Sequence, residues 1–190
     1  TKDVPVPPGF EPDDETIPLD PNFPQHKFLG FISYLASTTR VDLKAPLNRL
    51  ARYINKWNTA CTKACKHLAR YIKKTRDLGL RYHADDDLAN KAIGFSDYGS
   101  HSVDRSTGGY TIILNGAAVR SSTWSIKGTK TSTGWGEAEA LKEGVRALIA
   151  TRDLLAEFMF PQTFMSNPLF CDSKAVISAV VGLSLIHISE

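Results

Sequence analysis

Hydrophobic residues recur at helical spacing in three stretches before position 80 and in one longer stretch after position 130. Residues 26–37 suit a short helix, and two more are expected over about 43–57 and 59–78. The longest and clearest helix is predicted over residues 132–158, which also carries two glutamates close to its start. Its expected buried face consists of Ala138, Leu141, Val145, Leu148, Ile149 and Leu155.

Between and after these helices the pattern changes to short apolar or alternating runs, which are typical of strands. We expect strands over residues 91–97, 109–115, 117–126 and 169–172, with a tight turn at Asn115 and Gly116 joining the second to the third. The order is then βββαβα, in which the long helix is a crossover to a parallel strand. The predicted fold class is therefore α/β, with a mixed sheet preceded by a small α-helical region.

Composition narrows the class of protein. An apolar content of 42% with 23% charged residues is that of a globular domain, and no apolar run is long enough to cross a membrane, so we expect no membrane partner. Three cysteines, an odd number, favour a reduced intracellular setting over a disulfide framework. Cys61, Cys65 and His67 are interpreted as a buried core group in preference to a metal site.

Charge divides the chain into three parts. Residues 1–27 hold two basic and six acidic residues and are rich in proline, as in an extended linker; residues 28–83 hold twelve basic and two acidic; residues 84–190 hold nine basic and twelve acidic. The basic middle part suits a phosphate backbone. Its candidate nucleic-acid-binding residues are Arg49, Arg52, Lys63, Lys66, Arg70, Lys73, Lys74 and Arg76. The alternative is the solvated face of an ordinary amphipathic helix.

Three acids occupy positions from which they can converge. Asp97 and Asp172 each end a predicted strand, and Glu139 lies in the first turns of the long helix, beside its predicted apolar face. Carboxylate oxygens are the ligands that Mg²⁺ prefers, and two such ions can clamp the attacking and leaving oxygens of a phosphodiester. Taken singly, each aspartate is better explained as a turn or cap residue.

Several phrases resemble one family in the family's own order. FLGFISYLASTTRVDL, LNRLARYI and LARYIKKTRDLGLRY, within residues 28–82, resemble the segment of copia-type retrotransposon Pol polyproteins that links the reverse transcriptase to its ribonuclease H. FSD, DRSTGGYTIIL, STGWGEAEALKEG and FCDSKAVI, which begin at residues 95, 104, 132 and 170, resemble the ribonuclease H itself.

The resemblance implies cleavage of the RNA strand of an RNA–DNA hybrid during reverse transcription, with two Mg²⁺ ions, or Mn²⁺ in their place. It assigns metal binding and catalysis to Asp97, Glu139 and Asp172, and it prefers Glu139 to Glu137. The implied partners are the hybrid and the reverse transcriptase portion of the same polyprotein, in a cytoplasmic virus-like particle or the nucleus. The alternatives are an inactive nucleic-acid-binding remnant and a structural connection module.

The sequence also departs from the family pattern. Tyr98 and Gly99 follow Asp97, where the family usually has a further acid and a tryptophan, and Gly134, Trp135 and Gly136 precede the glutamates. These glycines are expected to fray the start of the long helix. We expect residues 84–190 to form a ribonuclease H-like domain that is incomplete at its C-terminus, since the family's further histidine and fourth acid do not occur.

Overall fold

The computed structural model describes residues 4–7, 10, 12, 16–83, 91–99, 106–126, 133–158 and 167–187, the last segment with side chains only as far as 182. The chain forms two compact units, Thr1–Leu80 and Arg81–Glu190. Tyr82 and His83 belong to the second unit, because the Tyr82 hydroxyl donates to Ala118 O at 3.1 Å and His83 N donates to Asn115 O at 2.9 Å. No helix in the described part of the chain is both long and apolar enough to span a membrane.

The first unit is helical. It contains α1 (Gln25–Thr38), the 3₁₀ turn η1 (Val41–Leu43), α2 (Lys44–Ala51) and α3 (Thr59–Lys74). The second predicted helix ends earlier than expected, at Ala51, and α3 begins after Asn58, whose side chain accepts a hydrogen bond from Cys61 N at 3.0 Å. The core of this unit is built around fully buried side chains, which include Ile32, Leu43, Cys61, Cys65 and Leu68.

Described residues of the acidic N-terminal segment pack on these helices, whereas an extended linker was expected. Phe10 is buried, and the Phe23 ring stacks on Trp57 with their centroids 5.6 Å apart. Asn58 Nδ2 donates to Pro12 O at 2.8 Å, which satisfies a buried amide. The aromatic residues of this segment therefore supply part of the apolar area that the short helices need.

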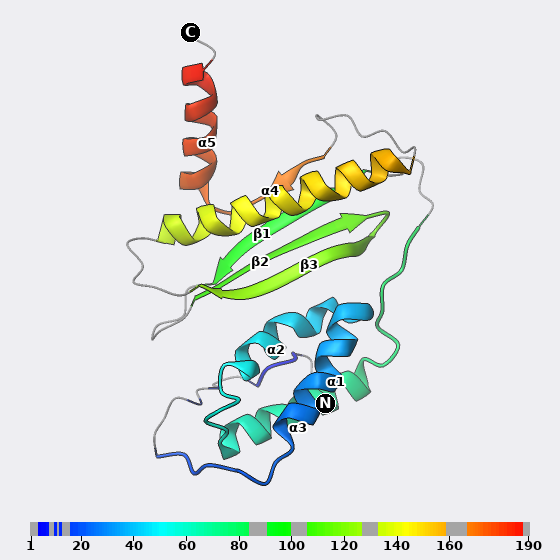
Figure 1. Ribbon diagram of the computed structural model, residues 1–190, viewed down its shortest axis with the longest axis vertical. Helices are drawn as coiled ribbons and strands as arrows, with labels where there is room; N and C mark the ends of the chain where they lie inside the picture. Colours follow the sequence, from blue (N-terminus) through cyan, green and yellow to red (C-terminus); the bar gives the residue numbers. More distant parts are fainter. Residues whose placement is uncertain are drawn as a thin grey trace. The chain divides into compact units, whose positions relative to one another are not determined.

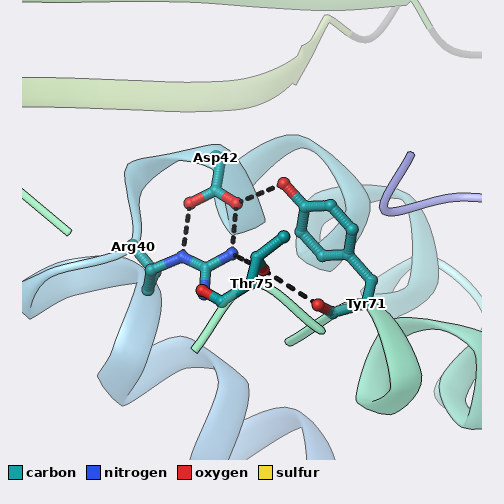
Figure 2. A network of polar contacts seen from close by, with 4 residues as sticks. All are labelled: Arg40, Asp42, Tyr71 and Thr75. Carbon is teal, nitrogen blue, oxygen red and sulfur yellow. Dashed lines mark hydrogen bonds and ion pairs between the residues drawn. The ribbon is translucent and has the colours of Figure 1, made fainter. Parts of the chain in front are cut away.

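A polar network joins the end of α1 to the end of α3 (Figure 2). Arg40 is almost fully buried and donates to both carboxylate oxygens of Asp42, at 2.9 and 2.8 Å. It also donates to the carbonyl and the hydroxyl of Thr75, and the Tyr71 hydroxyl donates to Asp42 at 2.9 Å. Such a bidentate, multiply bonded guanidinium fixes the relative position of the segments that it joins.

The second unit is a four-stranded mixed sheet covered on one face by a long helix (Figure 1). Its elements are β1 (Ile93–Gly99), β2 (Ser106–Leu114), β3 (Ala117–Ile126), α4 (Thr133–Glu157), β4 (Leu169–Phe170) and α5 (Lys174–His187). The strand order is β3-β2-β1-β4, with antiparallel β1–β2 and β2–β3 pairs and a parallel β1–β4 pair. The predicted order βββαβα and the parallel crossover are confirmed, and this α/β arrangement is compatible with a ribonuclease H-like fold.

The turn between β2 and β3 is the predicted one. Asn115 and Gly116 have φ values of 51° and 84°, as both central residues of a type I′ hairpin require.

Other strand ends differ from the expectation. Asp97 does not end β1, because Tyr98 and Gly99 continue the pairing with β2, and β4 ends at Phe170, before Asp172.

Small residues let α4 lie close to the sheet. A Cβ at Gly144 would lie 3.3 Å from both the Leu169 Cδ1 atom and the Ser96 Cβ atom, and a Cβ at Gly136 would collide with the Tyr98 ring. The glycine at position 136 was expected to fray the helix; instead it lies inside α4, at a close approach to β1.

The face that α4 buries is rotated from the predicted one. Ala138, Val145 and Ile149 are exposed. The buried positions are Gly136, Glu137, Ala140, Gly144, Ala147, Leu148 and Thr151. Of the predicted face, Leu148 is buried and Leu155 packs against the same core. Val145 and Ile149 were expected to be buried because they are large and apolar, whereas close helix–sheet contact selects small residues.

Candidate metal-binding carboxylate site

The structure brings three ligand-bearing side chains together where α4 passes the end of β4. A carboxylate oxygen of Glu137, the Cys171 Sγ atom and a carboxylate oxygen of Asp172 all lie within 4.8 Å of one another. Glu137 comes from the first turns of α4, and the other two come from the segment between β4 and α5. The cluster thus depends on the crossover that places β4 beside β1.

Glu137 is the buried member of the cluster. Only 8% of its surface is exposed, and its Oε2 atom has no hydrogen-bond partner among the described residues. Burial, together with the negative charges of Asp172 and Asp97, raises the pKa of Glu137 above its ordinary value. A buried carboxylate with an unpartnered oxygen, beside Asp172 and within reach of the charge of Asp97, is a place where a cation would be stabilised.

Asp97 lies near this cluster but is not part of it. It is exposed on β1 and pairs in register with Gly109 of β2. Its neighbours in sequence, Ser96 and Tyr98, are buried toward α4, so the alternation of the strand places Asp97 on the other face. It acts on Glu137 through its charge.

Glu139, the glutamate preferred from the sequence, takes part in a different interaction. Its two carboxylate oxygens accept hydrogen bonds from Lys142 Nζ, at 2.6 and 2.5 Å, on the same helix. Asp97 and Asp172 contribute to the pKa shift of Glu137, whereas the described polar contacts of Glu139 are with Lys142. The structure therefore brings Glu137, and not Glu139, together with Asp172. The metal-binding role of Glu139 stays a prediction.

The burial of Glu137 follows from its place on one helical face. Glu137 precedes Ala140, Gly144, Ala147 and Leu148 by three, seven, ten and eleven residues, which is one helical face of mostly small residues. Cys171 directly precedes Asp172 in the sequence. Its neighbour Ser173 donates a backbone N–H hydrogen bond to the Cys171 Sγ atom at 3.5 Å.

The candidate basic residues fall into two groups. Arg49 and Arg52 are half-buried: Arg49 donates to Phe10 O at 2.5 Å and lies over the Phe10 ring, and Arg52 donates to Asn48 Oδ1 at 3.2 Å. Of the other six, five lie on α3 and Arg76 follows the end of that helix. They are Lys63, Lys66, Arg70, Lys73, Lys74 and Arg76, and each is exposed. Those on α3 recur at helical spacing on the side opposite the buried cysteines.

The thiols of α3 behave as core residues. Cys61 and Cys65 are completely buried, and burial, with a smaller effect of Cys61, raises the pKa of Cys65 to about 12. The His67 Nε2 atom lies 2.8 Å from Val4 O, so the ring is held by the N-terminal segment. The interpretation of these residues as a core group agrees with this burial.

Curated proteins to which the chain is similar include one from yeast and one from Plasmopara viticola. It is 31% identical over 108 residues to the putative transposon Ty5-1 protein of Saccharomyces cerevisiae, covering 56% of this chain and 34% of that protein. It is 32% identical over 113 residues to the secreted RxLR effector protein 161 of Plasmopara viticola, covering 58% of this chain and 76% of that protein. The chain belongs to the same protein family as the Plasmopara viticola relative. It spans about a third of the yeast relative. No protein-family model and no solved structure matches it.

Proposed function

We propose that this chain is the connection region and ribonuclease H-like domain of a retrotransposon polyprotein, and that it hydrolyses the RNA strand of an RNA–DNA hybrid. Its similarity to a putative transposon protein supports a retroelement origin. The β3-β2-β1-β4 sheet with α4 as the crossover is an arrangement compatible with ribonuclease H. The further partner in this proposal is the reverse transcriptase portion of the same polyprotein.

The observation that carries the proposal is the buried, unpartnered Glu137 Oε2 atom beside Asp172 and near Asp97. These residues fit a divalent cation, because the carboxylates repel one another without one and the Glu137 Oε2 atom has no hydrogen-bond partner among the described residues. Glu137 and Asp172 would hold Mg²⁺ or Mn²⁺, and Asp97 would contribute charge. When bound, such ions activate water and stabilise the leaving oxygen.

The residues of the chain itself have two roles in this proposal. The carboxylates of Glu137 and Asp172 supply the negative charge that attracts cations to the end of β4. Without bound cations, the same charge would repel a phosphodiester. The exposed basic residues of α3 would contact the phosphates of the hybrid without reading its sequence.

The test is cleavage of a hybrid with a labelled RNA strand, in Mg²⁺ and then in Mn²⁺. Glu137→Gln should lower the rate on the order of 100-fold, as expected for loss of a charge-stabilising group, whereas Glu139→Gln, its matched control on the same helix, should stay within about threefold. Asp172→Asn should resemble Glu137→Gln. A loss in Glu139→Gln with cleavage intact in Glu137→Gln would instead support the ligand set expected from the sequence.

A second candidate function is nucleic-acid binding without cleavage. The observation that favours it is the exposed basic stripe on α3, which needs no intact carboxylate site. Hybrid binding, measured by fluorescence anisotropy, should weaken steeply as salt rises. Replacing Lys66 and Arg70 together by glutamine should make this salt dependence shallower, by about 1 in the log–log slope for each phosphate that is no longer neutralised. Such binding, with no cleavage in either metal, would favour this function.

A further inference from the structure

The cluster at the end of β4 contains a sulfur that the proposed hydrolysis does not use. Cys171 Sγ lies within 4.8 Å of the ligand oxygens of both Glu137 and Asp172. Mg²⁺ prefers oxygen ligands, so a magnesium site gives no reason for a thiol among them. A sulfur with two carboxylates is a donor set suited to a softer cation.

Glu137 provides a second feature that points to a ligand. The side chain is more than nine-tenths buried, its Oε2 atom has no hydrogen-bond partner among the described residues, and a carboxylate oxygen of the same residue is one of the three clustered atoms. Buried polar atoms without partners are rare in folded proteins and call for an explanation such as a bound ion. The unpartnered Glu137 oxygen and the nearby Cys171 thiol are therefore two separate observations that support a bound ion.

The spacing of the three atoms agrees with a small tetrahedral ion. Zinc–sulfur and zinc–oxygen bonds of about 2.3 and 2.0 Å place tetrahedral ligand atoms about 3.5 Å apart. Atoms that already lie within 4.8 Å of one another reach this spacing by a shift of roughly 1 Å. Cys171 is held in place by the Ser173 N–H group, as an outer hydrogen bond commonly orients a ligand.

We propose that Glu137, Cys171 and Asp172 form a binding site for a single zinc-class divalent cation, with the fourth position open to water. Three protein ligands and an open position are the arrangement of zinc sites that remain accessible to other molecules. The half-buried Cys171 and the exposed Asp172 leave a path by which the ion enters. Glu137 and Asp172 are also the proposed ligands of Mg²⁺ or Mn²⁺, so the zinc-class ion would compete with these ions for the site. The inference concerns binding alone and does not depend on hydrolysis of a hybrid.

The direct test uses Cd²⁺ as a spectroscopic substitute for Zn²⁺. One equivalent of Cd²⁺ added to the full chain should produce the ultraviolet charge-transfer band of a cadmium–thiolate bond, and Cys171→Ser should lack it. Cys61 and Cys65 are fully buried and remain in both proteins, so they serve as the internal background. A band of equal size in Cys171→Ser, or no band in the unmodified chain, would overturn the proposal.

Calorimetric titration with Zn²⁺ gives the second readout. Loss of an outer-shell partner alone costs 10- to 100-fold in metal affinity, so loss of a ligand in Cys171→Ser or Glu137→Gln should weaken Zn²⁺ binding about 100-fold. Glu139→Gln should bind Zn²⁺ as the unmodified chain does. Equal weakening by Glu137→Gln and Glu139→Gln would argue against the site, and hybrid cleavage plays no part in either measurement.

Discussion

The ring of Tyr98 fills the space that a side chain at position 136 would need. Tyr98 lies on β1 and Gly136 in the first turns of α4, and the Tyr98 hydroxyl is anchored by a hydrogen bond to the Ser106 Oγ atom at 2.8 Å. Tyr98 and Gly136 are therefore complementary in size. They bring the start of α4, and Glu137 with it, down onto the sheet.

Replacing Gly136 by alanine should destabilise the sheet unit by about 2 kcal/mol, because the added methyl group overlaps the buried Tyr98 ring. Gly182→Ala is the control: it is also helical, its Cβ would meet nothing within 4 Å, and alanine should stabilise α5 by about 0.5 to 1 kcal/mol. Urea unfolding measures both. The Gly136→Ala effect should shrink in a Tyr98→Leu background, and an undiminished effect there would contradict the assigned contact.

Replacing Glu137 by glutamine should stabilise the chain by about 1 kcal/mol when no divalent cation is present, because it removes a buried charge from beside Asp172 and Asp97. Glu139→Gln should lower stability by up to about 0.5 kcal/mol, because its pair with Lys142 on the same helix is removed. Denaturant unfolding in a chelator distinguishes the two. A larger stabilisation in Glu139→Gln would mean that the buried face of α4 is assigned wrongly.

Acid should selectively weaken the helical unit through Asp42. Burial alone would raise the pKa of this carboxyl, but the hydrogen bonds from Arg40 and Tyr71 outweigh it, so the pKa in the folded chain is lowered. A lowered folded pKa means that the contribution to stability is complete above the unfolded value and disappears as pH falls through the folded value. At neutral pH, Asp42→Asn should cost about 2 kcal/mol, and this difference should shrink below roughly pH 4.

The measurement is urea unfolding of the unmodified chain and of Asp42→Asn across this pH range. A difference between them that stays constant down to about pH 2 would show that Asp42 acts through its shape and not through its charge.

Lysine should not substitute for Arg40. The guanidinium makes two bonds to Asp42 and two to Thr75, and an ammonium cannot reproduce this planar arrangement, so Arg40→Lys should cost about 3 kcal/mol. Tyr71→Phe removes a single hydrogen bond to Asp42 and should cost about 1 kcal/mol. Thermal unfolding of the two variants compares them, and similar costs would show that the network contributes no more than one ordinary hydrogen bond.

Local sequence patterns predicted the sheet unit well. The bounds of β3 and the turn at Asn115 and Gly116 agree with the structure, because alternation and positive φ are properties of short segments. The packing of the N-terminal segment was not predictable in this way: Phe10 and Phe23 lie in a proline-rich, aperiodic stretch, and their burial depends on partners tens of residues away.

The positions of Glu137 and Glu139 show where the sequence pattern failed for α4, which is in the direction of its buried face. Helical residues that are two positions apart differ by about 200° in direction, so an error in the buried face exchanges one glutamate for the other. The error came from counting Val145 and Ile149 as buried, although both are exposed. The close fit of Gly136 against Tyr98 decides the orientation, and such fits are visible only in three dimensions.

The pairing of β4 with β1 extends over two residue pairs, Gly94 with Leu169 and Phe95 with Phe170. A ladder this short, formed late in the chain, is the part of a sheet that opens first. When it detaches, Cys171 and Asp172 leave Glu137 while the β1–β2–β3 meander stays intact. If the proposed cation binds, its occupancy and the docking of β4 are linked, so bound ion should slow amide hydrogen exchange in β4 and removal of the ion should speed it.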